Sequence, residues 1–220
     1  VGLQPGDRVL EIGCGWGGFA EEAARAGAAV TCLTISREQA EFARNRMEKA
    51  GLADRVDIRL QDYRDVDGAF DRIVSIEMFE AVGEENWPVY FDAVRDRLRT
   101  GGTAMLQIIT IANERFEAYR RSVDFIQRYI FPGGMLPSPQ ALATAISDAG
   151  LKLASSHYFG LSYAETLKQW AERFMAAWPG IEPLGFDLRF QRMWQYYLHS
   201  CEGCFRRGAI DVGQFEIVKG

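Results

Sequence analysis

Histidine and cysteine are scarce in this chain, and acidic residues outnumber basic ones. Each of these features argues against one class of function. The 220 residues include 2 histidines and 4 cysteines, and the formal net charge is −5. His157 and His199 stand far apart, and the C-x-x-C pair Cys201 and Cys204 has no second pair to complete a metal site. We therefore expect no metal centre and reduced thiols. Because nucleic-acid binding needs a clustered positive face, we also expect no nucleic acid as a partner.

Long hydrophobic runs are absent as well. No stretch approaches the ~20 apolar residues that a membrane-spanning helix needs, and the opening residues VGLQPGDRVLEIG lack the order of a secretory signal. With 48% hydrophobic residues, the chain can still bury a substantial core. The expectation is one cytoplasmic globular domain over residues 1–220.

Apolar runs alternate with helical patterns through the first half of the chain. This alternation predicts an α/β fold with a doubly wound, mostly parallel sheet, whose ligands bind beyond the carboxyl ends of the strands. Ser36 is the expected N-cap of one helix, with Gln39 completing a capping box and Gly51 as the C-cap. The predicted strands are residues 8–14, 29–35, 56–62, 70–77 and 103–111, and the predicted helices are residues 19–27, 36–51 and 87–102.

This rhythm changes after residue 111. Residues 112–139 are rich in aromatic side chains and predict helix followed by a proline–glycine turn, at a position suited to a substrate cover. The residues that follow again show helix and strand patterns typical of the core. These patterns predict a helix over 138–150, a strand over 151–160, a long helical region over 163–205 and a last strand over 210–220.

The stretch VLEIGCGWGGFA, residues 9–20, joins the first predicted strand to a glycine-rich turn. Gly13, Gly15 and Gly18 fit the G-x-G-x-x-G spacing of dinucleotide sites, a pattern that a turn without a ligand can also produce. Glu11, two residues before the first glycine, favours a ligand that carries a cation over one that carries a pyrophosphate. The resulting E-x-G-x-G pattern resembles the first motif of class I S-adenosylmethionine (SAM) methyltransferases.

Further residues follow the same resemblance. Polar groups at the end of the predicted strand 29–35 suit ribose hydroxyls, and Gln61 and Asp62 end the next strand, where such enzymes hold adenine. The cofactor-binding residues implied in this way are Glu11, Gly13, Gly15, Gly17, Thr34, Ile35, Gln39, Gln61 and Asp62.

Six segments narrow the resemblance to one family. EIGCGWGG, TISREQ, SIEMFEAVG, RYIFPGGMLPS, YAETLKQW and YYLHSCEGCF occur in this order and cover nearly the whole chain. Together they resemble the catalytic domain of the cyclopropane-fatty-acid synthase family, which includes the mycolic acid methyltransferases. The resemblance implies a seven-stranded class I fold with a helical insertion over the active site. It also implies methyl transfer from SAM to the cis double bond of an unsaturated phospholipid acyl chain, then loss of a proton and ring closure.

A base must take that proton. The resemblance implies a bound bicarbonate, held by groups at Cys14, Glu80, Gln107, Ile109 through its backbone, and Tyr163. Where the family usually has a histidine, this chain has Gln107, which can donate a hydrogen bond but cannot carry charge. The alternative product is therefore a methylene- or methyl-branched acyl chain.

Two further sets of side chains are candidates for the reaction. Cys201 matches a cysteine of the family, although the chemistry requires no covalent intermediate. Aromatic faces can stabilise the carbocation that follows methyl transfer. Trp16, Phe79, Tyr163 and Trp170 are the candidates, with core packing as the alternative for Phe79 and Trp170.

The partners follow from the implied substrate. We expect transient contact with the inner face of a membrane, and the sequence leaves open whether the chain forms a homodimer. Family members carry an N-terminal helical region that this sequence does not include, so weak SAM binding and slow turnover are expected of these 220 residues alone. The rival hypotheses are a small polar acceptor and a catalytically silent SAM-binding subunit.

Overall fold

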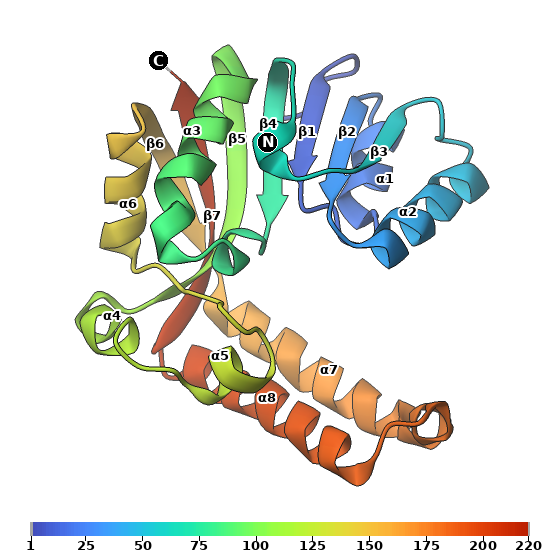
Figure 1. Cartoon of the computed structure of the whole chain (residues 1–220), viewed down its shortest axis with the longest axis vertical. Coiled ribbons are helices and arrows are strands. Elements are labelled where there is room, and N and C mark those ends of the chain that lie inside the picture. The colour runs from blue at the N-terminus through green and yellow to red at the C-terminus, as the bar shows by residue number, and fades with distance from the viewer. Residues whose placement is uncertain (1, 220) are drawn as a thin grey trace.

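A seven-stranded sheet with helices on both faces organises the computed structural model, which describes residues 2–219 (Figure 1). The strand order is β3-β2-β1-β4-β5-β7-β6. All neighbouring pairs are parallel except those that include β7, which runs antiparallel to β5 and β6. This confirms the doubly wound α/β prediction. The strands are β1 (Arg8–Ile12), β2 (Ala29–Thr34), β3 (Val56–Leu60), β4 (Phe70–Ile76), β5 (Leu98–Ile111), β6 (Leu151–Tyr158) and β7 (Ile210–Lys219).

Different helices cover the two faces. Helices α1 (Gly18–Arg25) and α2 (Arg37–Ala50) lie on one face, and α3 (Trp87–Arg97) and α6 (Pro139–Asp148) lie on the other (Figure 1). The α1–α2 cluster is built largely from alanines, which let these helices approach the strands closely. The opposite cluster contains Tyr90, Phe91 and other large side chains. Side chains alternate along each strand, so a single strand contributes to both clusters.

The start of α2 contains one correction. Ser36 is the N-cap and accepts a hydrogen bond from the Gln39 backbone N–H at 3.2 Å, and Gly51 is the C-cap with φ 69°. The predicted capping box is wrong. The Gln39 side chain instead accepts from the Thr34 hydroxyl at 2.7 Å, and that hydroxyl accepts the Ser36 N–H at 3.2 Å. The Thr34 hydroxyl binds the Gln39 side chain in place of the Ser36 backbone N–H because Thr34 lies at the end of β2, directly beside the cap.

The boundary between α3 and β5 also differs from the prediction. The helix predicted to reach residue 102 ends at Arg97, because Leu98 already pairs with Phe70 of β4 and is 1% exposed. The register then shifts between Phe70 and Arg72, and the chain turns through Gly101 with φ 75° before regular pairing resumes at Thr103. Burial of Leu98 outweighs the helical periodicity before it.

The predicted helical region 163–205 is two antiparallel helices. Helix α7 (Gly160–Ile181) and helix α8 (Leu188–Arg206) are separated by the short η4 (Glu182–Leu184). The break follows from local chemistry, since Gly185 takes a left-handed φ of 98° and the Asp187 side chain caps the Phe190 N–H of α8. The hairpin lies below the carboxyl ends of the parallel strands (Figure 1).

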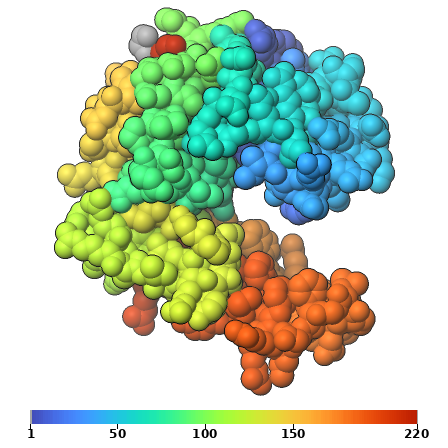
Figure 2. All heavy atoms as spheres, in the orientation of Figure 1, coloured from blue at the N-terminus to red at the C-terminus, as the bar shows by residue number. Residues whose placement is uncertain are grey.

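Residues 112–139 form the remaining cover at this edge. Helix α4 (Asn113–Tyr119) and helix α5 (Phe125–Tyr129) confirm the helical prediction, and α5 begins with a capping box between Asp124 and Gln127. The space-filling view shows a hollow between the α7–α8 hairpin and the part of the molecule that carries β2 and α2 (Figure 2). Within residues 2–219, no helix combines the length and the apolar character that crossing a bilayer requires.

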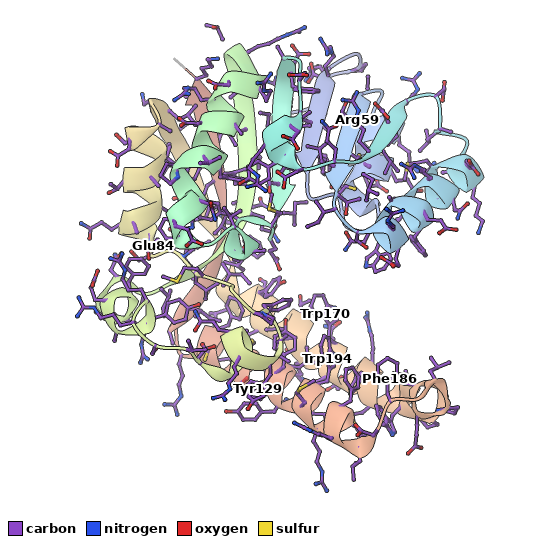
Figure 3. The ribbon with its side chains drawn as sticks, viewed as in Figure 1. Arg59, Glu84, Tyr129, Trp170, Phe186 and Trp194 are labelled. Atoms are coloured by element: carbon purple, nitrogen blue, oxygen red, sulfur yellow. The ribbon has the colours of Figure 1, made fainter. Side chains whose placement is uncertain are left out.

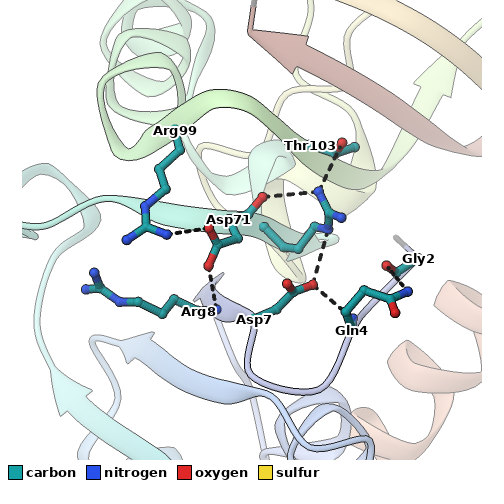
Figure 4. Close-up of polar contacts among 8 residues, drawn as sticks. Gly2, Gln4, Asp7, Arg8, Asp71, Arg99 and Thr103 are labelled. Carbon is teal, nitrogen blue, oxygen red and sulfur yellow. Dashed lines mark hydrogen bonds and ion pairs between the residues drawn. The ribbon is translucent and has the colours of Figure 1, made fainter.

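A polar network holds the opposite, amino-terminal edge of the sheet together (Figure 4). The Asp71 carboxylate at the start of β4 accepts the Arg8 backbone N–H at 2.8 Å and the Arg99 guanidinium at 2.5 Å. Arg72 lies 3.5 Å from the Asp7 carboxylate and 3.5 Å from the Thr103 hydroxyl. Charged groups at this amino-terminal edge connect β1, β4 and β5. The candidate site lies at the opposite, carboxyl edge of the sheet.

Candidate active site

The glycine turn after β1 presents bare backbone at the carboxyl edge. Gly13, Gly15 and Gly17 have φ values of 79°, 51° and 78°, a region that disfavours side chains. A Cβ at Gly13 would lie 2.7 Å from the Met78 side chain, whereas a Cβ at Gly15 would meet nothing within 4 Å. Gly13 is therefore required by packing, and Gly15 leaves open space that a ligand can approach.

Glu11 is a buried acid at this turn. Its side chain is 3% exposed, and the Cys32 thiol donates to its Oε2 at 3.5 Å. Burial, with a smaller contribution from Cys14, raises the pKa of Glu11 to about 8. Near neutral pH the carboxyl is therefore largely protonated until a cation lies beside it. This chemistry suits the positively charged part of SAM.

The ends of β2 and β3 complete the same edge. The Gln61 backbone N–H donates to the Thr34 carbonyl at 3.0 Å, and Ile35 is 80% exposed. Asp62 is already engaged, because its carboxylate accepts the backbone N–H and the guanidinium of Arg64 at 2.8–2.9 Å at the start of η1 (Tyr63–Asp65). The predicted cofactor residues thus gather along the ends of three adjacent strands, next to a glycine cradle. The open backbone at Gly15 and the polar groups at these strand ends suit the chemistry of SAM.

Glu77 is the residue that the sequence analysis missed. It directly follows β4 with φ 53°, and its N–H donates to the Gln107 carbonyl at 2.8 Å. Its carboxylate accepts the Gln107 side-chain N–H at 2.8 Å on Oε1 and the Tyr163 hydroxyl at 2.7 Å on Oε2. The available signal was an acid at the carboxyl end of a buried strand, within the segment SIEMFEAVG.

Glu80 lies one turn further on, in η2 (Phe79–Ala81). Its Oε1 accepts the Ile109 backbone N–H at 2.6 Å. Its Oε2 is buried and finds no hydrogen-bond partner among residues 2–219. Burial, with a contribution from the charge of Glu77, raises the pKa of Glu80 to about 8. At neutral pH this side chain is therefore mostly a neutral acid with an O–H to donate.

The two groups that bond to Glu77 are themselves fixed. The Gln107 Oε1 accepts from the Gln214 amide of β7 at 3.2 Å, which directs the Gln107 N–H toward Glu77. Burial and the Glu77 charge raise the pKa of Tyr163 above its ordinary value, so its phenol stays a donor. The structure thus brings Glu80, Gln107, Ile109 and Tyr163 together, with Glu77 among them.

Both cysteines of the predicted site lie outside this cluster of bonds. The Cys14 thiol is 4% exposed and donates to the Gly15 carbonyl at 3.9 Å, in the α1–α2 core cluster that also contains Cys32. Burial raises the pKa of Cys201 to about 12, which keeps its thiol protonated and makes it a poor nucleophile. In the described part of the chain, neither thiol hydrogen-bonds to Glu77 or Glu80.

The four aromatic side chains that could stabilise the carbocation differ in how deeply they are buried. Phe79 is 1% exposed and packs against Trp87, Tyr90 and Phe91, which confirms core packing for it. Trp170 is 43% exposed on α7 and lies edge-on to Tyr163 with 6.2 Å between ring centroids (Figure 3). Trp16 is 53% exposed in the glycine turn. Of the four candidates, Tyr163 hydrogen-bonds to Glu77, and Trp170 packs against Tyr163.

The donors expected to hold bicarbonate are already paired within the chain. Gln107 and Tyr163 donate to Glu77, and the Ile109 N–H donates to Glu80. An added anion would compete with the Glu77 carboxylate for the same two donors and would be repelled by it. In this arrangement, the residues present do not fit a bound bicarbonate.

Comparison with known proteins places this geometry in a family. The profile of the family described as mycolic acid cyclopropane synthetase matches residues 1–215. The chain belongs to this family. It is 46% identical over 220 residues to the tuberculostearic acid methyltransferase UfaA1 of Mycobacterium tuberculosis, a match that covers 100% of this chain and 52% of the relative. It is 44% identical over 220 residues to the cyclopropane-fatty-acyl-phospholipid synthase of Escherichia coli K12, covering 99% and 55%.

A solved structure agrees with the fold. The mycolic acid cyclopropane synthase CmaA1 complexed with SAH and CTAB superposes with a TM-score of 0.91 at 30% identity, covering 100% of this chain and 80% of that chain. The seven-stranded arrangement is therefore that of a class I SAM methyltransferase, and the family is one of SAM-dependent methyltransferases. The chain spans about half the length of the curated relatives it matches.

The raised pKa of Glu80 generates a stability prediction. In the unfolded chain this group has its ordinary pKa of 4.5, so the protein loses stability as pH rises from that value through about 8. The loss is at most about 1.4 kcal/mol per pH unit in that interval. Glu80→Gln removes this titration, so its unfolding free energy relative to wild type should rise between pH 5 and pH 8 in denaturant titrations at each pH. A difference that stays constant over this range would contradict the assignment.

Proposed function

We propose that this protein transfers a methyl group from SAM to the cis double bond of an unsaturated phospholipid acyl chain and forms a cyclopropane ring. The observation that carries the proposal is the carboxyl edge itself. A glycine cradle with the buried acid Glu11 lies on the same edge as the Glu77, Gln107 and Tyr163 cluster, above a hairpin rich in exposed aromatic side chains. The names of the two curated relatives support a fatty acyl acceptor.

The residues of the glycine edge would hold the cofactor, which supplies an electrophilic methyl group on a sulfonium. The open backbone at Gly15, in the turn that Gly13 and Gly17 shape, lets the methionine part approach closely, with Glu11 beside its positive charge. Thr34, Ile35 and Gln39 would contact the ribose. Gln61 and Asp62 would lie next to the adenine.

An acyl chain suits the surface opposite this edge. Trp170, Tyr129 and Phe186 are 43%, 50% and 41% exposed along α5, α7 and the start of α8 (Figure 3). A polar acceptor would need several converging hydrogen-bonding groups, whereas an acyl chain needs apolar contact and exclusion of water. The same surface is suited to transient contact with the inner face of a membrane.

Positioning accounts for most of the catalysis. The alkene π electrons form a bond to the methyl carbon as the bond from carbon to sulfur breaks, and a cation develops on the second alkene carbon. The faces of Tyr163 and Trp170 can stabilise that cation. Loss of one methyl proton then closes the ring. If a 1,2-hydride shift first moves the cation to the carbon that carries the methyl, the same loss gives a methylene branch. A saturated methyl branch needs a hydride as well, and therefore a separate reductant.

The product and the base are both open to test. The neutral Gln107 and the 46% identity to a tuberculostearic acid methyltransferase favour a branched chain as the second candidate product. The bicarbonate implied by the family resemblance is the alternative base, although its expected donors are paired with Glu77 and Glu80. The roles of Cys14 and Cys201 stay predictions. A catalytically silent SAM-binding subunit is the rival function.

Isotope labelling tests the activity. The protein is incubated with heavy-methyl SAM and vesicles of a cis-monounsaturated phospholipid, and the lipid is analysed by mass spectrometry and proton NMR. We expect ring signals and one label lost per transfer. Glu80→Gln should lower turnover by about a hundredfold or more, and the exposed Glu114→Gln is the matched control. SAM binding without transfer to any lipid would instead make the chain a silent subunit.

Cofactor binding should depend on pH through Glu11. Because a cation favours the ionised form of a carboxyl whose ligand-free pKa is about 8, SAM affinity should rise between pH 6 and 7.5, by at most about tenfold per pH unit. Glu11→Gln should bind weakly with no such slope, and Glu41→Gln on the exposed face of α2 should match wild type. Isothermal titration calorimetry measures all three. A flat wild-type profile would exclude this role of Glu11.

A further inference from the structure

We propose that the carboxylate of Glu77 is the base that takes the proton after methyl transfer, in place of a bound anion. This inference rests on the proposed methyl transfer to an alkene. It assigns to one side chain of the protein a step that the family resemblance assigns to bicarbonate.

The first support is the hydrogen-bond pattern. Gln107 and Tyr163 each donate one hydrogen bond to a different oxygen of Glu77, at 2.8 and 2.7 Å. These are two of the groups expected to hold the external anion, and they hold a carboxylate of the chain instead. Each carboxylate oxygen has two acceptor positions, so one position on each oxygen remains for an incoming proton.

The second support is the backbone of Glu77. Among residues 2–219 it is the only non-glycine residue with a positive φ, at 53°. This conformation is unfavourable for a residue with a Cβ. The Gln107 carbonyl holds the Glu77 N–H at 2.8 Å while the Gln107 side chain holds the carboxylate. The same partner therefore fixes a strained backbone and aims its side chain.

The third support is the division of roles between two neighbouring acids. Glu80 is desolvated, and its Oε2 is buried without a partner in the described structure, which favours the neutral form. Glu77 instead accepts two hydrogen bonds, from Gln107 and Tyr163. Neighbouring carboxyl groups in contrasting environments are a recurring sign of acid and base assignments. The neutral Gln107 is consistent with this division, since a covalently attached carboxylate needs no positive charge to retain it.

The step balances without a further reagent. A C–H bond of the transferred methyl breaks, and its electron pair closes the third bond of the ring at the cationic carbon. The proton passes to an oxygen of Glu77, which later releases it to solvent. If the hydrogen on the methylated carbon first shifts as a hydride to the cationic carbon, loss of the same methyl proton forms the double bond of a methylene branch, so the assignment holds for either product.

The test compares wild type, Glu77→Gln, Glu77→Gly and the exposed control Glu114→Gln in buffer freed of carbon dioxide, with and without added bicarbonate. Label transfer to cis-monounsaturated phospholipid vesicles gives the rate. Wild type and Glu114→Gln should respond to bicarbonate by less than about twofold, and Glu77→Gln should be slower by about a hundredfold or more. Glu77→Gly vacates the carboxylate position, so added bicarbonate should restore part of its rate.

Two further readouts separate a base from a structural residue. Because glycine adopts a positive φ freely, Glu77→Gly should keep the fold of wild type, with an unchanged circular-dichroism spectrum, although its turnover is lower. In carbon-13 NMR with labelled bicarbonate, line broadening should occur with Glu77→Gly and not with wild type. If wild type needs bicarbonate, or Glu77→Gln keeps the wild-type rate, the assignment is overturned while the methyl transfer stands. If wild type labels no lipid, the proposed function fails first.

Discussion

Two hydrogen bonds to one carboxylate determine how the candidate site is assembled. Gln107 of β5 and Tyr163 of α7 both donate to Glu77 at the end of β4. These contacts attach the aromatic hairpin to the catalytic edge of the sheet. The first turn of α7 has a second polar contact at this edge, because the Gly160 N–H donates to the Asp211 carboxylate of β7 at 2.9 Å. The position of the proposed acceptor surface relative to the glycine cradle therefore depends on both Glu77 and Asp211.

Two acidic side chains of the site, Glu11 and Glu80, are buried away from water. Burial raises the pKa of each to about 8. Burying a carboxyl group costs free energy. The two buried groups stand where the proposed chemistry needs a carboxyl group, one beside a cationic cofactor and one beside a reacting chain. Structural charge networks occupy the opposite edge, where Asp71 joins Arg8 and Arg99.

Sequence reasoning recovered the fold because the alternating pattern reflects burial on both faces of a parallel sheet. It failed where tertiary contacts override local signals. Leu98 leaves the helical pattern to pair with Phe70, and Thr34 takes the Gln39 side chain from the expected capping box. The glycine turn and Glu80 could be read from their motifs. The place of Glu77 at a strand end could be read from its motif as well. Its contacts could not, because its partners lie 30 and 86 residues further along the chain and a left-handed backbone at a glutamate has no signature in the sequence.

If the Glu77 carboxylate itself occupies the position of the base, a crystal structure of the protein with SAH and an unsaturated lipid, grown in the presence of bicarbonate, should show it there. We expect Glu77 to keep its bonds to Gln107 and Tyr163, with one carboxylate oxygen facing the space between the sulfur and the lipid double bond. A bicarbonate ion bonded to Gln107, Ile109 and Tyr163, with Glu77 turned away, would contradict it.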